Sequence, residues 1–145
     1  MAVAGIGNTK AEANLDQDCG SGTPATWYCA LLTAMPSDGD GTGLVEATWT
    51  GYARQSITNN NTNFPGSTII THIATKTCQA SINFGTVAGL GSPITVVGIA
   101  LFDASSGGVM GRTAVFGTPA SPVTYQLSNG SALSIAAGNL SFQEV

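Results

Sequence analysis

Turn-forming clusters divide most of this chain into short segments of about the length of a β-strand. Gly, Asp, Asn, Ser and Pro gather at residues 36–43, 59–66, 105–108 and 128–130, and these residue types favour turns. The runs between the turns are rich in β-branched and aromatic residues, which favour strands. Turns at this spacing leave no room for long helices or for the helical crossovers of a parallel sheet. We therefore expect an all-β fold.

The order of apolar and polar residues predicts how each strand is buried. Residues 94–102 contain few polar side chains, which indicates a central strand covered on both faces. Residues 76–85 alternate between apolar and polar, which indicates a half-buried strand. About nine such strands describe a β-sandwich, a jelly roll or a barrel. The expected strands cover residues 26–33, 44–50, 52–58, 67–74, 76–85, 93–103, 109–116, 123–127, 132–135 and 140–145.

The N-terminal segment is the one part of the chain that favours a helix. Thr9 and Glu12 have the spacing of a capping box, so we expect a short helix over residues 9–18. The total length of 145 residues fits one domain. We therefore divide the chain into an N-terminal arm with a short helix, residues 1–24, and a single β-sandwich or jelly-roll-like domain, residues 25–145.

The low charge of the chain indicates how it works. Charged residues make up 8% of the sequence, against about 25% in an average soluble domain. A weakly charged surface associates readily, which predicts a subunit that binds neighbouring proteins. The basic residues Lys10, Arg54, Lys76 and Arg112 are scattered, and the net charge is −4, so we expect no binding to nucleic acid.

The cysteines predict neither a metal site nor a disulfide framework. The chain has an odd number of cysteines, Cys19, Cys29 and Cys78, and no two of them form a C-x-x-C pair. We therefore expect small buried thiols and no cofactor. The first residues lack the features of a signal peptide, and no apolar run approaches the length of a membrane span. We expect assembly in a reducing cytoplasm and no contact with a membrane.

The chain shows no motif for catalysis. His72, the single histidine, lies in a predicted strand, and no G-x-S-x-G motif accompanies it. Asp103 follows an apolar strand at a turn, where its carboxylate can accept backbone N–H groups. No glycine-rich segment has the spacing of a phosphate loop. We therefore expect that the protein is not an enzyme.

The loop that begins at Asp38 resembles part of a calcium-binding loop. Asp38, Asp40 and Thr42 fall at positions 1, 3 and 5 of an EF-hand loop, and Gly43 falls at position 6. Position 12, which should be a bidentate Glu, is Trp49. An ordinary turn between strands is the simpler interpretation, and an irregular cation site is the alternative.

Short strings along the chain resemble, in order, those of a known family. They are TWYCALLTAMPSD from residue 26, Glu46 followed by GYARQ from residue 51, INF from residue 82, VGIALFDASSGG from residue 97 and NGSALSIAAGNL from residue 129. This order is similar to that of small phage virion proteins usually labelled tail fibre proteins, over about residues 10–142. Trp27, where Leu is usual, and the loop at 59–66 depart from the family pattern.

The resemblance implies a structural protein of a bacteriophage virion, and we expect a homotrimer. We favour a capsid decoration, or cement, protein bound across subunits of the major capsid protein, because the chain has no heptads or repeats from which to build a stalk. Other virion proteins are alternative partners. The second interpretation is a trimeric tail fibre or tailspike head that binds a host-surface glycan.

Two groups of residues are candidates for contacts. Tyr52 and Arg54 alternate in a predicted strand and share a face, with Glu46 as a partner for the guanidinium group. They form either an intrachain salt bridge or a contact between subunits. A glycan site would need an exposed aromatic platform, for which the candidates are Trp27, Trp49 and Tyr125.

Overall fold

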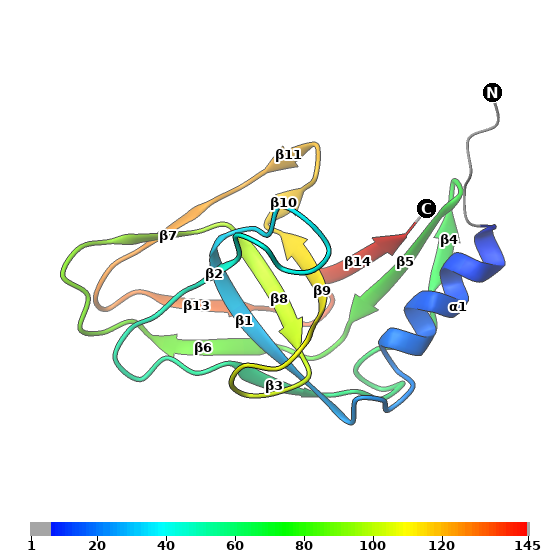
Figure 1. Cartoon of the computed structure of the whole chain (residues 1–145), viewed down its shortest axis with the longest axis horizontal. Helices are drawn as coiled ribbons and strands as arrows, with labels where there is room; N and C mark the ends of the chain where they lie inside the picture. Colours follow the sequence, from blue (N-terminus) through cyan, green and yellow to red (C-terminus); the bar gives the residue numbers. More distant parts are fainter. Residues whose placement is uncertain (1–6, 145) are drawn as a thin grey trace.

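A five-stranded antiparallel sheet forms the centre of the fold in the computed structural model, which describes residues 7–144 (Figure 1). Four of its strands lie in the order β2-β1-β8-β9, and β3 also pairs with β1. The strands are β1 (Thr26–Ala34), β2 (Val45–Glu46), β3 (Gln55–Thr58), β8 (Gly98–Phe102) and β9 (Met110–Val115).

The centre of this sheet is buried on both faces. Every residue of β8 is buried, which confirms a central strand at residues 98–102, whereas residues 94–96 of the same predicted strand form a separate strand in another sheet. Because side chains alternate across a strand, Leu31 and Leu101 enter the main core, whereas Leu32 and Phe102 enter a smaller cluster on the other face.

Smaller antiparallel sheets lie on either side of the central sheet (Figure 1). The three-stranded sheet β14-β5-β4 and helix α1 lie at one end of the molecule, and the pair β13-β6 extends toward the other end. The all-β fold with a short N-terminal helix is therefore confirmed, while the jelly-roll connectivity stays a prediction. The remaining elements are α1 (Asn8–Asp18), β4 (Thr68–Ile70), β5 (Ile73–Cys78), β6 (Ile82–Thr86), β7 (Ile94–Val96), β10 (Gly117–Thr118), β11 (Ser121–Pro122), β12 (Tyr125–Leu127), β13 (Ala132–Ile135) and β14 (Leu140–Glu144).

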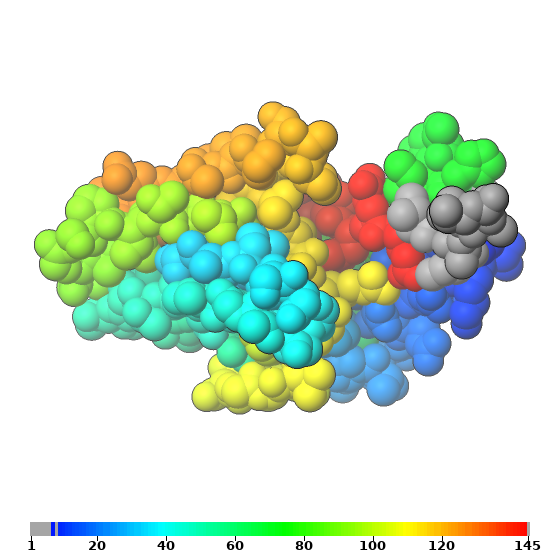
Figure 2. Space-filling model, turned by 45° about the horizontal axis from the view of Figure 1, so that its top comes forward, coloured from blue at the N-terminus to red at the C-terminus, as the bar shows by residue number. Residues whose placement is uncertain are grey.

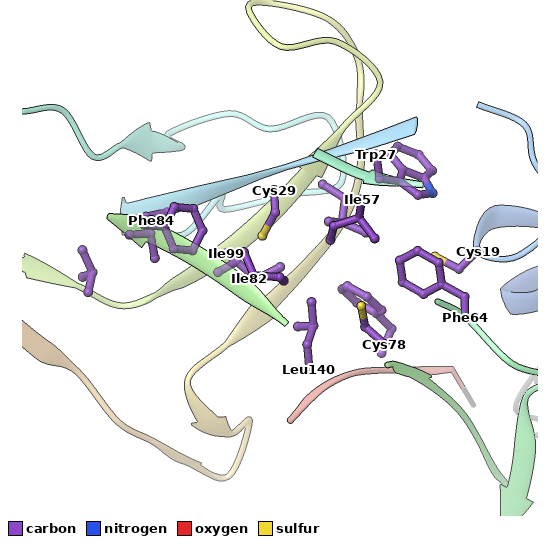
Figure 3. Close-up of a cluster of buried hydrophobic side chains, with 14 of the residues drawn as sticks. Cys19, Trp27, Cys29, Ile57, Phe64, Cys78, Ile82, Phe84, Ile99 and Leu140 are labelled. Carbon is purple, nitrogen blue, oxygen red and sulfur yellow. The ribbon is translucent and has the colours of Figure 1, made fainter. Parts of the chain in front are cut away.

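The main core joins the sheets and the helix (Figure 3). Ala11, Leu15 and Cys19, from the helix and its end, are at most 1% exposed and belong to this core. The three cysteines are buried and unbonded to one another, as predicted. The helix is thus packed into the domain over its described residues.

The helix begins differently from the prediction. Gly7 occupies the N-cap position and, among the described residues, no side-chain hydrogen bond caps the helix, so the predicted capping box of Thr9 and Glu12 is wrong. The helix starts at Asn8, which places Thr9 inside the first turn. The backbone N–H groups of Lys10 and Ala11 instead bind the carbonyl oxygen of Gly7, at 2.8 and 3.0 Å.

Several predicted strands are shorter than expected. Residues 76–85 do not form one strand, because the chain leaves β5 after Cys78 and enters β6 at Ile82 in a different sheet. Thr71 and His72 form a turn with φ of 49° and 65°, so His72 is not in a strand. The β10–β11 hairpin was not predicted, because its strands of two residues leave no periodic pattern.

Candidate functional site

Glu46, Tyr52 and Arg54 form one hydrogen-bonded cluster within the chain. The Arg54 guanidinium group binds Glu46 through Nε and Nη2, with Nη2 2.8 Å from Oε2. The Tyr52 hydroxyl donates to Glu46 Oε1 at 2.9 Å and accepts the backbone N–H of Leu31 at 3.0 Å. Burial, together with the nearby Glu46 carboxylate, raises the pKa of Tyr52. The three candidates are thus brought together, and their contact with a second subunit stays a prediction.

Arg54 also holds the loop between β8 and β9. Its Nη1 donates to the carbonyl oxygens of Ala104 at 2.9 Å and Gly107 at 2.7 Å, and its guanidinium carbon lies 3.8 Å from the centre of the Phe102 ring. The Arg54 side chain is 9% exposed. It is therefore a structural clamp with most of its donors occupied.

The clamped loop presents an apolar side chain to the surface. Asp103 Oδ1 accepts the backbone N–H of Val109 at 2.7 Å, as predicted for this carboxylate. Val109 is 70% exposed and lines a hollow of about 450 Å³ together with Leu44 and Met110. Figure 2 shows this loop (yellow) projecting beside the segment around residues 36–46 (cyan).

The loop at Asp38 folds as a tight turn. Thr42 donates its backbone N–H to Asp38 and Asp40, and its hydroxyl to Asp40 at 2.6 Å. Hydrogen bonding with the Asp38 carboxyl group and with Thr42 lowers the pKa of Asp40 to about 2. Within residues 7–144, no group of three or more His, Cys, Asp or Glu side chains is placed to hold a metal ion. The hydrogen bonds of Thr42 are those of the predicted turn, and the irregular cation site stays an alternative prediction.

Two ion-pair groups fasten the helix to the sheets. Arg112 binds Asp18 through Nε at 2.8 Å and Glu144 through Nη2 at 3.0 Å. Although burial opposes it, hydrogen bonding with Glu144 and Asp18 raises the pKa of Arg112. Lys76 is buried, and its Nζ lies 2.8 Å from Oδ1 of Asp16. Together with Arg54, three of the four basic side chains are paired inside the chain.

The three aromatic candidates for a glycan platform lie in different surroundings. Trp27 is 5% exposed, and its indole N–H donates to the carbonyl oxygen of Asp18 at 2.9 Å. Trp49 is half-buried and meets Tyr52 edge-on, with ring centres 4.7 Å apart. Tyr125 is 45% exposed. Of the three, Tyr125 is thus the residue with a ring available to a ligand.

Tyr125 stands at a cleft of about 460 Å³. Its ring meets Phe116 edge-on, with centres 5.3 Å apart. The buried side chains of Ile99 and Leu140 also line the cleft. A second hollow of about 370 Å³ adjoins it, and Figure 2 shows the surface hollowed between the β10–β11 hairpin (orange) and β14 (red). The residues that line both hollows are Ala114, Val115, Gly117 and Ser141.

Among the residues that line this cleft, Tyr125 was predicted from the sequence and the others were not. Phe116, Ser134 and Asn139 line it from separate segments of the chain. No short motif joins them, and each has the composition of an ordinary strand or turn residue. Ser134 lies in β13, which pairs with β6, whereas Phe116 follows β9 and Asn139 precedes β14. Sequence spacing does not encode this long-range arrangement.

Comparison with known proteins relates nearly the whole chain to one family. The family model described as podophage GP4 fiber I protein gp80 matches residues 7–143. No curated protein matches the sequence significantly. Within the part of the chain that the structure describes, no helix has the length and apolar character needed to cross a membrane.

Proposed function

The chain belongs to the podophage GP4 fiber I protein gp80 family, and from this premise we propose that it is a non-enzymatic module of a phage tail fibre. The family makes it a virion-associated structural protein. The observation that carries the proposal is the extent of the match, which runs from the start of α1 into β14. The folded module as a whole, and not a short attachment segment, therefore corresponds to the fibre family.

The surface supports a role in assembly. Three of the four basic side chains are paired internally, which leaves few charges to repel a neighbouring subunit. Large apolar side chains are exposed, as expected where one protein binds another. Outside the cleft beside Tyr125, they are Val45, Ile70, Val109 and Val123. We propose that the module forms a homotrimer, with itself and other virion proteins as partners.

The arrangement of titratable groups supports a structural role. The Arg54 and Arg112 clusters are satisfied by bonds that fasten loops and the helix. Asp103 and Asp40 hold turns. The same internal pairing of basic groups gives little support to binding of nucleic acid.

A capsid decoration protein is the second candidate function. The observation that favours it is the compact module, whose described residues contain one helix of 11 residues and no stalk. A module of this kind could bind across subunits of the major capsid protein and stabilise the assembled shell by mass action.

Particles that lack the protein distinguish the two functions. The tail-fibre function predicts normal particle stability on heating and reduced adsorption to host cells. The decoration function predicts the reverse, with DNA released at a lower temperature and adsorption almost unchanged. Light scattering of the purified protein tests the trimer separately, since a mass near 14.6 kDa at micromolar concentration would contradict it.

A further inference from the structure

We propose that the cleft beside Tyr125 binds an uncharged oligosaccharide, an inference that rests on the proposed fibre function. The cleft and its adjoining hollow share a wall formed by β9 and the residues that follow it. Their volumes of about 460 and 370 Å³ lie within the usual range of about 300–1,000 Å³ for ligand sites. Two adjoining hollows suit an extended ligand of several sugar units better than one small molecule.

The apolar wall matches the C–H face of a sugar ring. Tyr125 is 45% exposed, and its edge-on contact with Phe116 restrains the ring without enclosing it. Leu133 and Ile135 are half-buried and extend this wall. A pyranose ring has an apolar face of C–H groups, and an exposed aromatic ring is the protein surface that packs best against it.

The polar side chains of the cleft have unused hydrogen-bonding capacity. Ser134, Asn139 and Ser141 are exposed and line the cleft, and their side chains make no hydrogen bond with any described residue. Gln143 lines the adjoining hollow, is also exposed, and its side chain makes no hydrogen bond with any described residue. Hydroxyl and amide groups both donate and accept hydrogen bonds, as sugar hydroxyls do.

The lining carries no formal charge. Among the described residues that line either hollow there is no Asp, Glu, Lys, Arg or His. A carboxylate or phosphate on the ligand would find no cation here. The structure therefore favours a neutral oligosaccharide over one that contains uronic acid or phosphate groups, and it predicts binding that depends little on salt.

An added β-strand from a partner protein fits the cleft less well. β9 has a free edge on this side among the described strands, which is the usual place for strand addition. However, Cα atoms of β9 and β14 come within 8 Å of each other. Two strands that flank an inserted strand would lie about 9.5 Å apart. β9 and β14 therefore approach each other too closely for a third strand to lie between them at these residues.

Titration of the purified protein tests the inference. An array of neutral and uronic-acid-containing bacterial oligosaccharides identifies a neutral probe, and calorimetry then measures its Kd at low and high salt. We expect Tyr125→Ala to weaken binding by about tenfold and Asn139→Ala by about fivefold, whereas Tyr125→Phe keeps the ring and changes Kd less than about threefold. Gln17→Ala, at an exposed residue outside both hollows, should leave Kd unchanged.

The alternative outcomes are distinct. Absence of any neutral ligand, a preference for anionic oligosaccharides, or equal affinity of Tyr125→Ala and the unmodified protein would overturn the inference. A change in oligomeric mass with Tyr125→Ala would also overturn it, because the cleft would then be a contact between subunits. Circular dichroism of each variant establishes that the fold is retained.

Adsorption experiments with phage particles distinguish a failure of the glycan site from a failure of the fibre function. Phage carrying Tyr125→Ala should contain the protein in normal amount and adsorb poorly. Normal incorporation with normal adsorption would overturn the glycan site and leave the fibre function standing. If adsorption is also normal in phage without the protein, the fibre function fails as well.

Discussion

The ammonium group of Lys76 lies 2.8 Å from the carboxylate of Asp16, although the lysine side chain is 1% exposed and the aspartate is 48% exposed. The ion pair joins β5 to α1, and the Asp16 carboxylate lies at the edge of the core. A buried ammonium group that loses its partner is costly, whereas replacement of the pair by apolar groups is not. This relationship gives the first prediction.

Asp16→Asn should destabilise the fold by about 1–2 kcal/mol, a value reduced for the exposure of the aspartate. The double variant Asp16→Asn/Lys76→Met should recover most of this loss, because no buried charge is left unpaired. Urea denaturation measures the free energy of unfolding of the single and the double variant. Equal loss in the single and double variants would show that the pair contributes nothing through its charge.

The same pair predicts a dependence on pH. Although burial opposes it, the hydrogen bond from Lys76 lowers the pKa of Asp16 below its value in the unfolded chain. A depressed carboxyl pKa stabilises the fold above the unfolded pKa, about 3.9, and this stability is lost as the pH falls through the folded pKa. Unfolding free energy measured from pH 6 to pH 2 should fall less steeply for Asp16→Asn than for the unmodified protein.

Arg54→Lys should destabilise the fold by about 2–3 kcal/mol. Lysine cannot bind Glu46, the carbonyl oxygens of Ala104 and Gly107 and the Phe102 ring at the same time. Hydrogen exchange should accelerate at Val109, whose loop Arg54 holds. Lys10→Gln, at an exposed residue, is the control. Unchanged exchange at Val109 would contradict the role of Arg54 as a clamp.

Leu101→Ala should destabilise the fold by about 2–5 kcal/mol, because the Leu101 side chain is fully buried in β8. Ile70→Ala, where the side chain is 69% exposed, should change stability by less than about 0.5 kcal/mol. Chemical denaturation compares the two. A small effect at Leu101 would show that β8 is not part of the cooperative core.

The thiols should react slowly with a thiol reagent in the native state. Burial raises the pKa of Cys19 to about 12 and also raises that of Cys29 and Cys78, so little reactive thiolate exists at neutral pH. Absorbance during reaction with a chromogenic disulfide measures the rate, which should rise on denaturation. Stability that drops under a reducing agent would contradict free thiols.

Local patterns in the sequence predicted some elements and failed for others for physical reasons. Residues 94–102 contain few polar side chains, and the buried strand they predicted is β8, although the first part of the range forms β7 in a different sheet. Residues 76–85 kept an unbroken alternation, yet the chain changes sheets between Cys78 and Ile82. Alternation reports which side chains face a core, but it cannot report which strand lies alongside.

The contacts of the candidate residues also show that local sequence patterns do not report long-range neighbours. Glu46, Tyr52 and Arg54 are close in sequence, and their pairing could be predicted from spacing. The alternation places Lys76 on the same buried face as Cys78, but its partner Asp16 lies on a helix 60 residues away. The spacing of residues in the strand carries no information about that helix, so the ion pair could not be predicted.

Removal of residues 1–22 should unfold or severely destabilise the protein. The described part of this segment supplies the buried side chains of Ala11, Leu15 and Cys19, together with the partners of Lys76 and Arg112. Leu15→Ala should alone cost about 2–5 kcal/mol, while Gln17→Ala, on the exposed side of the same helix, should be nearly neutral. Thermal unfolding followed by circular dichroism compares these three variants with the full chain. A truncated protein that unfolds cooperatively at the same temperature as the full chain would show that the helix is a separable arm.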